Sequence, residues 1–400
     1  MILKNARIIS PADGLDDVAD IEIENGIITK IESNIAGEGI DFSNKFILPG
    51  LVDMHCHLRE PGFEYKEDLK SGIESALAGG FTAICPMANT NPVVDNVEIL
   101  EQILSKTEGI GLHQICSLTK NLEGKESVDF EGLKKAGAIA FSDDGKPVEN
   151  FEIYIQALKS GNLVISHAED SILGGTPLSE AVSVARELEV LRFVGGKLHF
   201  AHISTKRSVE LIRQAKSDGL KVTCETAPHY FCFSNKNETV DGRFKMNPPL
   251  RAQEDVKAVI EGLKDGTIDC IATDHAPHSL EEKTKPFAEA PFGIVGFETA
   301  FGAAFRYLVI EEHLTLPQLI EKMSVNPAKI LGLSDIGTVK VGQKANLTVV
   351  DPYKEYKVDA KNFKSKCKIS PFEGVKLQGR VVATVVDGEI KIHEAKLCKR

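Results

Sequence analysis

Short apolar segments recur along the middle of the chain, from about Leu51 to about Gly332. The eight segments are Leu51–Met54, Phe81–Cys85, Leu112–Cys116, Ala138–Phe141, Leu163–Ile165, Leu198–Ala201, Val222–Cys224 and Cys270–Ala272. Between most of them the apolar residues return every three or four positions, the period of an amphipathic helix. These helical stretches include Lys66–Leu77, Val97–Leu104, Phe130–Ala136, Ser179–Phe193, Ser208–Ala215 and Glu254–Leu263.

Strands that alternate with helices predict parallel βα units. Eight such units in roughly 280 residues match a (β/α)8, or TIM, barrel in both count and length. A doubly wound open sheet is the alternative. It is disfavoured because no G-x-G-x-x-G turn follows an early strand.

Both ends of the chain show a different pattern, in which apolar and polar residues alternate. Such runs flank Asn25-Gly26 near the start and Asp387-Gly388 near the end, and Leu347–Val350 adds a further strand. Asn-Gly and Asp-Gly supply the positive φ angles of a tight turn, so each end predicts a β-hairpin. Two β segments too small to fold alone are expected to pack together. We therefore expect an α/β protein with a barrel over residues 50–336 and a small β-sandwich domain formed by residues 1–49 and 337–400.

The composition of the chain argues against several classes of function. The 400 residues include 47 Lys and Arg against 58 Asp and Glu, a net charge of −11. Such a surface repels nucleic-acid phosphates and anionic lipids, so we expect neither nucleic-acid nor membrane binding. No apolar run reaches the roughly 18 residues of a membrane span and no secretory pattern is seen, which predicts a cytoplasmic protein. The eight cysteines include no C-x-x-C pair and are interpreted as reduced, mostly buried thiols.

Residues that can bind metals follow the ends of the predicted strands. In a barrel these strand ends share one rim, so side chains far apart in the sequence meet there. Residues i and i+2 of a strand project to the same side, so His55 and His57 can reach one ion. Four histidines and two or three carboxylates exceed the needs of one tetrahedral ion and suit a bridged pair of ions. The candidates are His55, His57, Asp143, Asp144, His167, His202 and Asp274.

Four residues of this set have competing interpretations. Asp-Gly is common in turns, so Asp143 and Asp144 can both be turn residues; a ligand role is favoured, and Asp144 over Asp143. Asp274 follows a buried strand, where an acid needs a partner such as a metal, and the Ala-Pro pair that comes next disfavours a helix-cap role. His229 competes with His202 and ranks second, because the preceding proline indicates a loop.

Other polar residues at the same rim are candidates for binding a substrate. Arg59 lies two residues past the histidine pair, and its guanidinium offers a planar fork to a carboxylate. A surface salt bridge with a neighbouring glutamate is the alternative. Asn89, Asn247 and His278 are further candidates in loops, each weak by itself. His113, His199, His313 and His393 are interpreted as structural or surface residues.

Four motifs resemble those of dihydroorotases. Residues 53–62 (DMHCHLREPG) resemble the first signature of that family, and residues 272–278 (ATDHAPH), with Lys283 five residues on, resemble the second. Residues 245–251 (KMNPPLR) and 290–293 (APFG) are also similar to the family. The motifs occur in family order over nearly the whole chain. The resemblance is to the bacterial type I branch and implies the amidohydrolase superfamily, with a metal-dependent barrel and a small β domain from both termini.

The resemblance also implies a role for each residue. His55, His57 and Asp274 would hold one metal, His167 and His202 the other, and Asp144 would bridge them. Two Zn²⁺ ions per subunit are expected, with other divalent metals as alternatives. Asp274 would act first as general base and then as general acid. The expected substrate contacts are Arg59, Asn89 and His278 at the carboxylate, and Asn247 and the backbone of Phe292 and Gly293 at the ring amides. His57 is also expected to contact the substrate.

The implied reaction is the reversible interconversion of N-carbamoyl-L-aspartate and L-dihydroorotate in pyrimidine biosynthesis, with a metal-bound hydroxide as nucleophile. Hydantoinases and allantoinases, the alternative cyclic amidases, bridge their metals with a carboxylated lysine at the fourth strand. Here Ser142-Asp143-Asp144 stands at that strand end. A second alternative is a noncatalytic dihydroorotase-like subunit that scaffolds aspartate transcarbamoylase, which is disfavoured because the ligands are all kept.

For partners, we expect a small-molecule substrate, and leave a homodimer and a complex with aspartate transcarbamoylase open. One departure from the family is the segment between His167 and His202, which is short and indicates a trimmed surface loop.

Overall fold

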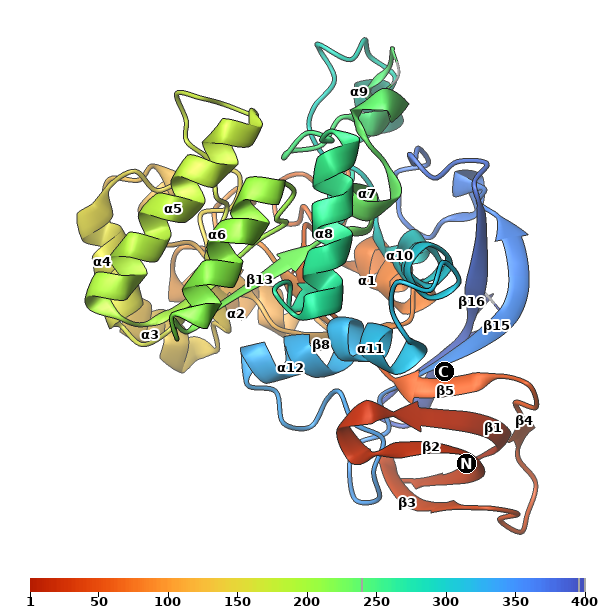
Figure 1. Cartoon of the computed structure of the whole chain (residues 1–400). Helices are drawn as coiled ribbons and strands as arrows, with labels where there is room; N and C mark the ends of the chain where they lie inside the picture. Colours follow the sequence, from red (N-terminus) through yellow and green to blue (C-terminus); the bar gives the residue numbers. More distant parts are fainter. Residues whose placement is uncertain (239, 395, 399–400) are drawn as a thin grey trace.

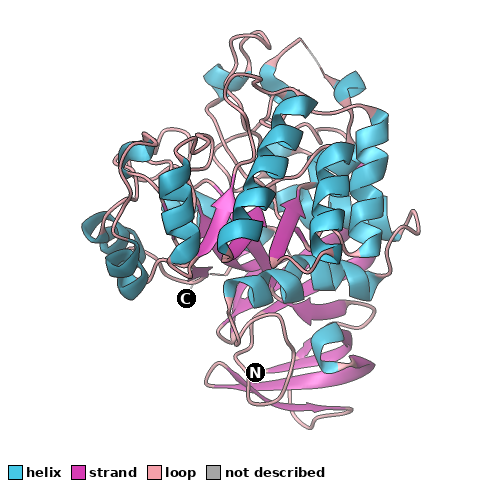
Figure 2. Cartoon of the chain, turned by 60° about the vertical axis from the view of Figure 1, so that its left-hand side comes forward, coloured by secondary structure: helices cyan, strands magenta, loops and turns pink. Residues whose placement is uncertain are grey.

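Eight parallel strand positions form a closed barrel in the computed structural model, which describes residues 1–238, 240–394 and 396–398 (Figures 1 and 2). The third position is split into β8 and β9. Closure occurs between the first and eighth positions, where the N–H of His57 donates to the carbonyl of His275 over 2.7 Å. The strands are β6 (Leu51–Cys56), β7 (Phe81–Pro86), β8 (Gly111–Leu112), β9 (Ile115–Cys116), β10 (Ala140–Phe141), β11 (Leu163–Ser166), β12 (Lys197–Phe200), β13 (Val222–Thr226) and β14 (Cys270–Ile271).

Helices surround these strands, as Figure 2 shows, and cover their apolar side chains. All six predicted helical stretches form helices. The prediction missed α4, although its buried residues Ile153, Tyr154, Ala157 and Leu158 recur at helical spacing. The helices are α1 (Leu69–Ala78), α2 (Val97–Ser105), α3 (Phe130–Ala136), α4 (Phe151–Lys159), α5 (Pro177–Val194), α6 (Lys206–Ser217), α7 (Pro228–Cys232), α8 (Gln253–Asp265), α9 (Leu280–Lys283), α10 (Phe297–Ala304), α11 (Leu316–Ile320) and α12 (Asn326–Leu331).

The two ends of the chain form one nine-stranded sheet. Its halves are joined where β5 pairs antiparallel with β15, with Leu347 opposite Pro49. In Figure 1 the first strands (red to orange) accordingly lie beside the last ones (blue). The strands are β1 (Ile2–Ser10), β2 (Leu15–Glu24), β3 (Ile27–Glu32), β4 (Ile40–Asp41), β5 (Phe46–Pro49), β15 (Leu347–Lys357), β16 (Lys376–Val386), β17 (Glu389–His393) and β18 (Lys396–Leu397).

A common apolar core packs both halves of this sheet, with Leu3 and Ile21 from one half and Leu347 and Val385 from the other. The two predicted hairpins meet at their turns: a Cβ atom on Gly26, whose φ is +82°, would lie 2.7 Å from the carbonyl oxygen of Asp387. Only glycine fits this approach. The predicted barrel with a small β domain from both termini is therefore confirmed.

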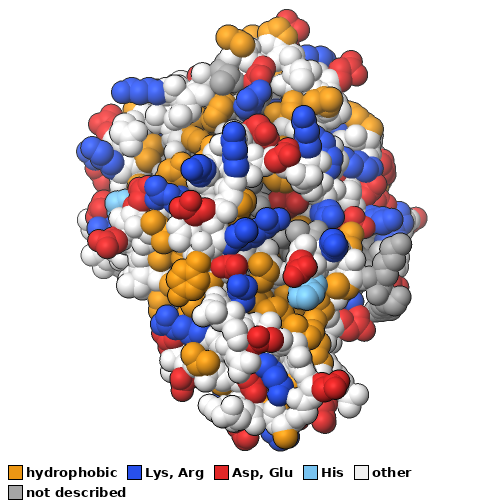
Figure 3. All heavy atoms as spheres, turned by 90° about the vertical axis from the view of Figure 1, so that its right-hand side faces the viewer, with side chains coloured by type: hydrophobic (Ala, Val, Ile, Leu, Met, Phe, Trp, Pro, Cys, Tyr) orange, Lys and Arg blue, Asp and Glu red, His pale blue; other side chains and the backbone are white. Residues whose placement is uncertain are grey.

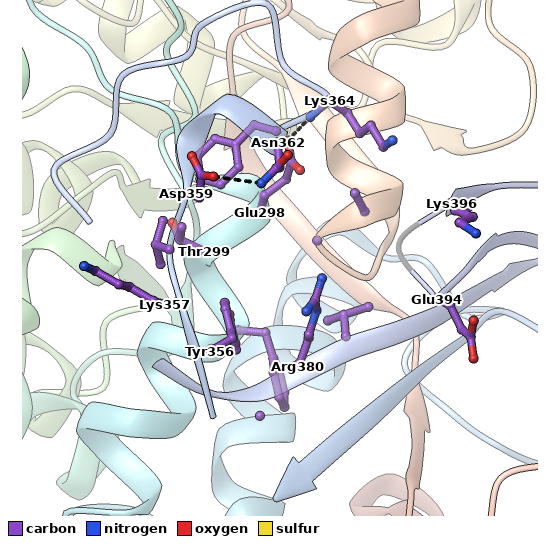
Figure 4. Close-up of a pocket in the computed structure, with 18 residues that line it drawn as sticks. Glu298, Thr299, Tyr356, Lys357, Asp359, Asn362, Lys364, Arg380, Glu394 and Lys396 are labelled. Carbon is purple, nitrogen blue, oxygen red and sulfur yellow. Dashed lines mark hydrogen bonds between the residues drawn. The ribbon is translucent and has the colours of Figure 1, made fainter. Parts of the chain in front are cut away.

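A cavity of about 450 Å³ lies where the barrel meets the terminal sheet, between α1, α10, β15 and β16 (Figure 4). Glu298 of α10 lines it. Its Oε1 accepts hydrogen bonds from the Ser75 hydroxyl (2.9 Å) and from the backbone N–H groups of Lys364 (2.6 Å) and Ser365 (3.2 Å). This one carboxylate therefore joins two barrel helices to the C-terminal segment.

The distribution of surface charge and the state of the cysteines match what the composition predicts. Basic and acidic side chains are interspersed over the face seen in Figure 3. Within the described part of the chain, no helix is long and apolar enough to cross a membrane. All eight cysteines are free, and only Cys398 is exposed, as the sequence predicted.

Candidate metal centre at the barrel mouth

A cavity of about 110 Å³ opens at the carboxyl ends of the barrel strands. All the site residues favoured from the sequence line it, except His55 and His278, which contact residues of the lining: His55 contacts Asp144 and Asp274, and His278 contacts Arg59. The lining residues are His57, Arg59, Asn89, Asp144, Gly145, His167, His202, Asn247, Asp274, Ala276, Phe292 and Gly293. The structure thus gathers residues from the ends of six strand positions at one mouth.

Asp144 lies at the centre of this cluster. Its Oδ1 is 3.5 Å from His55 Nε2, 3.5 Å from His167 Nδ1 and 3.7 Å from His202 Nε2, and its Oδ2 is 3.5 Å from His57 Nε2. Two compact sets of candidate ligands, His55 with His57 and His167 with His202, therefore share Asp144.

Asp274 lies beside the first of these sets. Its Oδ1 is 3.5 Å from His55 Nε2 and 3.3 Å from His57 Nε2. Ligands about 2.0–2.1 Å from a tetrahedral zinc ion are separated by about 3.3 Å, so these contacts suit ligands of a single ion. The Asp274 N–H donates to the His55 carbonyl over 3.0 Å, which fixes the two residues across the barrel closure.

The donor atoms of this cluster fit a divalent metal pair. Among the described residues, His55 Nε2 and Asp144 Oδ1 are buried and have no hydrogen-bond partner. Buried polar atoms without partners are costly, and a cation between them would remove that cost. Imidazole nitrogens and carboxylate oxygens suit zinc and neighbouring divalent metals.

The electrostatics of the cluster keep its carboxylates ionised. Burial opposes ionisation of Asp144, yet the nearby His55 and His167 hold its pKa well below the usual value. Asp274 shows the same balance: burial raises its pKa, and His55 and His57 lower it further than burial raises it. Both groups are therefore available as metal ligands.

Three site residues have backbones in the left-handed region. Arg59, His202 and Asp274 have φ angles of +64°, +33° and +47°. For residues other than glycine this conformation costs about 1–2 kcal/mol. Such strain is concentrated at functional sites, where the surrounding structure holds a side chain in one direction.

The structure distinguishes the residues that competed for a ligand role, Asp143 against Asp144 and His229 against His202. Asp143 turns away from the histidines: its Oδ1 accepts hydrogen bonds from the N–H groups of Leu118 (2.6 Å) and Thr119 (3.1 Å). His229, on α7, belongs to neither compact ligand set, although it is buried. Burial lowers its pKa to about 4. Asp144 and His202 are thus the residues that reach the cluster.

Arg59 and His278, two of the residues expected at a substrate carboxylate, lie next to each other at the cavity. The Arg59 Nε donates to the Pro277 carbonyl (3.1 Å), and one of its terminal nitrogens lies 3.4 Å from His278 Nε2. His278 Nε2 is also 2.7 Å from the Phe292 carbonyl. The pKa of His278 falls to about 3 because of its burial and because of the positive charges of Arg59 and Lys66. Neutral His278 therefore donates to Phe292.

Asn89 and Gly293, two more of the expected contacts, also have partners within the protein. Asn89 lines the cavity, but its Oδ1 is 2.8 Å from His57 Nδ1, so it also orients that ring. The Gly293 N–H donates to the Lys245 carbonyl over 3.0 Å. Because this N–H is already bonded, only the carbonyl group of Gly293 can make the expected contact with a substrate.

Sequence reasoning missed two carboxylates that support the histidines. Glu225 Oε1 lies 2.9 Å from His55 Nδ1, and its Oε2 lies 3.3 Å from His199 Nε2. Glu169 Oε2 lies 2.8 Å from His167 Nε2. An acid inside the buried strand β13 was the available signal for Glu225. Carboxylates in this position fix the tautomer and the ring direction of metal-binding histidines.

Comparisons with known proteins agree with this site. The model of the amidohydrolase family matches residues 46–391. The chain is 45% identical to a dihydroorotase of Acetivibrio thermocellus over 99% of this chain and 100% of the relative. It is 44% identical to a dihydroorotase of Trichlorobacter lovleyi over 98% of each. Among solved structures, an L-hydantoinase (dihydropyrimidinase) from Arthrobacter aurescens is similar, with a TM-score of 0.89 and 27% identity over 100% of this chain and 97% of that one.

These matches cover nearly the whole chain and include both the barrel and the terminal sheet. The resemblance to dihydroorotases in the sequence motifs is confirmed. The chain therefore belongs to the amidohydrolase family, with dihydroorotases among its relatives.

Proposed function

We propose that this chain is a metal-dependent dihydroorotase, a hydrolase of a cyclic amide bond that interconverts L-dihydroorotate and N-carbamoyl-L-aspartate. The relatives that are 44–45% identical over nearly the full chain support the reaction. The observation that carries the residue roles is that four histidines and two aspartates surround one small cavity that a guanidinium also lines.

A bound metal pair, zinc in our proposal, would polarise the ring carbonyl and lower the pKa of the attacking water. His55, His57 and Asp274 would hold one ion, His167 and His202 the other, and Asp144 both. Glu225 and Asn89 would keep the Nδ1–H tautomers of His55 and His57, so that each Nε2 presents its lone pair to the ion.

Asp274 is proposed as the group that moves the proton. As general base it accepts a proton from the attacking water, and as general acid it gives that proton to the ring nitrogen as the C–N bond breaks. In the direction of synthesis, the same carboxylate takes the proton from the nitrogen. Its place between the metal-binding histidines and the open cavity supports this role.

Arg59 is proposed to bind the substrate carboxylate. Because its Nε is held by the Pro277 carbonyl, the two terminal nitrogens are left to form a bidentate pair with a carboxylate. Asn89, whose Oδ1 faces His57, would add its amide nitrogen to this subsite. His278, whose one N–H goes to the Phe292 carbonyl, would support Arg59 instead of donating to the substrate. Asn247 and the Gly293 carbonyl would contact the ring amide groups.

Hydrolysis of hydantoin or allantoin is the other candidate function. The similarity of this chain to an L-hydantoinase structure supports it. The test compares hydrolysis of L-dihydroorotate, hydantoin and allantoin by the same metal-supplemented sample. We expect dihydroorotate to be the best substrate. Faster hydrolysis of hydantoin or allantoin would replace the proposed function with that alternative.

The oligomeric state of the protein, its complex with aspartate transcarbamoylase and its cytoplasmic location stay predictions. The homodimer and the complex with aspartate transcarbamoylase are tested by light scattering of the protein alone and of the mixture. A noncatalytic scaffolding role is disfavoured, because the predicted metal ligands are all present.

A further inference from the structure

Glu169 connects two parts of the site that the proposed reaction uses separately. It follows His167 by two positions, just past the end of β11, and its side chain is 20% exposed. Its Oε2 lies 2.8 Å from His167 Nε2 and accepts a hydrogen bond of 2.9 Å from the Asn247 side-chain amide. One carboxylate oxygen therefore contacts both a candidate metal ligand and a cavity residue from a distant loop.

The contact with His167 decides which ring nitrogen faces the metal cluster. The other nitrogen, Nδ1, lies 3.5 Å from Asp144 Oδ1 and 2.8 Å from His202 Nε2. A neutral imidazole carries one N–H, and a neighbouring carboxylate accepts a hydrogen bond from it. Glu169 thus holds the proton on Nε2 and leaves the Nδ1 lone pair directed at the ion shared with Asp144.

The contact with Asn247 fixes a loop that lies far away in the sequence. The loop is fastened on both sides of Asn247. Before it, the Lys283 ammonium donates to the Lys245 carbonyl (3.0 Å); after it, the Tyr230 hydroxyl donates to the Pro248 carbonyl (2.7 Å). The Asn247 amide nitrogen donates to Glu169 Oε2 over 2.9 Å and also lies 3.2 Å from His167 Nε2. Because that ring nitrogen carries the proton shared with Glu169, it cannot accept, and Glu169 is the acceptor. The direction in which Asn247 enters the cavity therefore depends on Glu169.

We propose that Glu169 is a positioning residue. It couples the binding of a metal by His167 and His202 to the binding of the substrate by Asn247. The inference rests on the proposed function and deepens it. Ordering of His167 by the metal holds Glu169 in place, and Glu169 then holds Asn247. Because such coupling is reciprocal, loss of Glu169 weakens both the metal at this position and the substrate.

The test uses Glu169→Gln, which keeps the size of the side chain and removes its charge. Titration of zinc-loaded protein with a chelator measures each metal affinity. We expect one of the two ions to bind about 10- to 100-fold more weakly, with the other unchanged. We also expect KM for dihydroorotate to rise by a larger factor than kcat falls. Glu149→Gln is the matched control: Glu149 is an exposed acid that accepts a hydrogen bond from the Ser171 hydroxyl, four residues past His167.

A double variant separates coupling from a general loss of structure. If Glu169 acts on the substrate through Asn247, Glu169→Gln raises KM little further in an Asn247→Ala background, while its effect on the metal persists. Equal loss of both ions, or unchanged metal affinity and KM in Glu169→Gln, would overturn the inference. Additive effects on KM would overturn it as well.

The outcomes also separate this inference from the proposed function. If the wild-type protein binds metal but does not hydrolyse dihydroorotate, the proposed function fails, and the coupling to substrate fails with it. If the wild type is active and Glu169→Gln behaves as Glu149→Gln does, only the role of Glu169 is lost.

Discussion

Replacement of Arg59 by Met tests how the cavity recognises its substrate. The variant keeps a long aliphatic side chain and removes the guanidinium that lines the cavity. The backbone cost at φ +64° is the same for Met as for Arg, since neither is glycine. The change therefore isolates the charged contact, together with the 3.1 Å hydrogen bond to the Pro277 carbonyl.

The size of the effect follows from the geometry. A hydrogen bond to a charged group contributes about 1.5–3 kcal/mol, and about 1.4 kcal/mol corresponds to a tenfold change. We expect KM for dihydroorotate to rise about 10- to 150-fold, with a smaller change in kcat, because the carboxylate is held in both the ground state and the transition state. Steady-state hydrolysis followed by ultraviolet absorbance measures both constants.

Lys66→Met is the matched control. Lys66 Nζ lies 3.2 Å from His278 Nδ1 and 3.2 Å from a Glu282 oxygen, so it is a neighbouring cation that does not line the cavity. If positive charge at the mouth only attracts the anionic substrate, both variants raise KM equally. That result, or an unchanged KM in Arg59→Met, would refute the direct contact.

Three further predictions follow from the same site and from the fold. Asp274→Asn is expected to abolish turnover while the protein still binds metal, as measured by metal analysis of the inactive sample; substantial activity would remove the acid–base role. Asp144→Ala is expected to lower the metal content, whereas Asp143→Asn keeps it, since Asp143 contacts the backbone of Leu118 and Thr119; the reverse pattern would exchange the two roles. Burial raises the pKa of Glu298 from 4.5 to about 7, despite the hydrogen bond from Ser75. The folded state therefore keeps a proton that the unfolded carboxyl releases, and the stability falls as the pH rises from about 4.5 to about 7, by about 3 kcal/mol at most. Glu298→Gln is expected to flatten this decline in urea unfolding between pH 5 and pH 8, and an equal decline in both proteins would contradict it.

The barrel and its mouth could be predicted because each candidate ligand lies at the carboxyl end of a strand or within three residues of it. The strand order alone then places His55, His167 and Asp274 at one rim. The hairpin turns at Asn25-Gly26 and Asp387-Gly388 likewise predicted the terminal strands. Neither signal depends on contacts between distant residues.

Supporting residues depend on such contacts, and sequence patterns do not report them. Glu225 meets His55 although 170 positions separate them. Side chains of successive residues at a strand end point in opposite directions. A shift of one residue in the predicted strand end would therefore exchange Asp143 and Asp144, and the sequence does not fix that position. The backbone of Gly293 was expected to contact a substrate, and only the fold reveals that its N–H is bonded to the Lys245 carbonyl.

Metal content and dihydroorotate hydrolysis, measured on one purified sample, test the central claim most directly. We predict two zinc ions per chain, loss of hydrolysis when a chelator removes them, and recovery when zinc is restored. A zinc-supplemented, folded protein that binds no metal at this cluster, or that holds both ions and leaves dihydroorotate intact, would contradict the account.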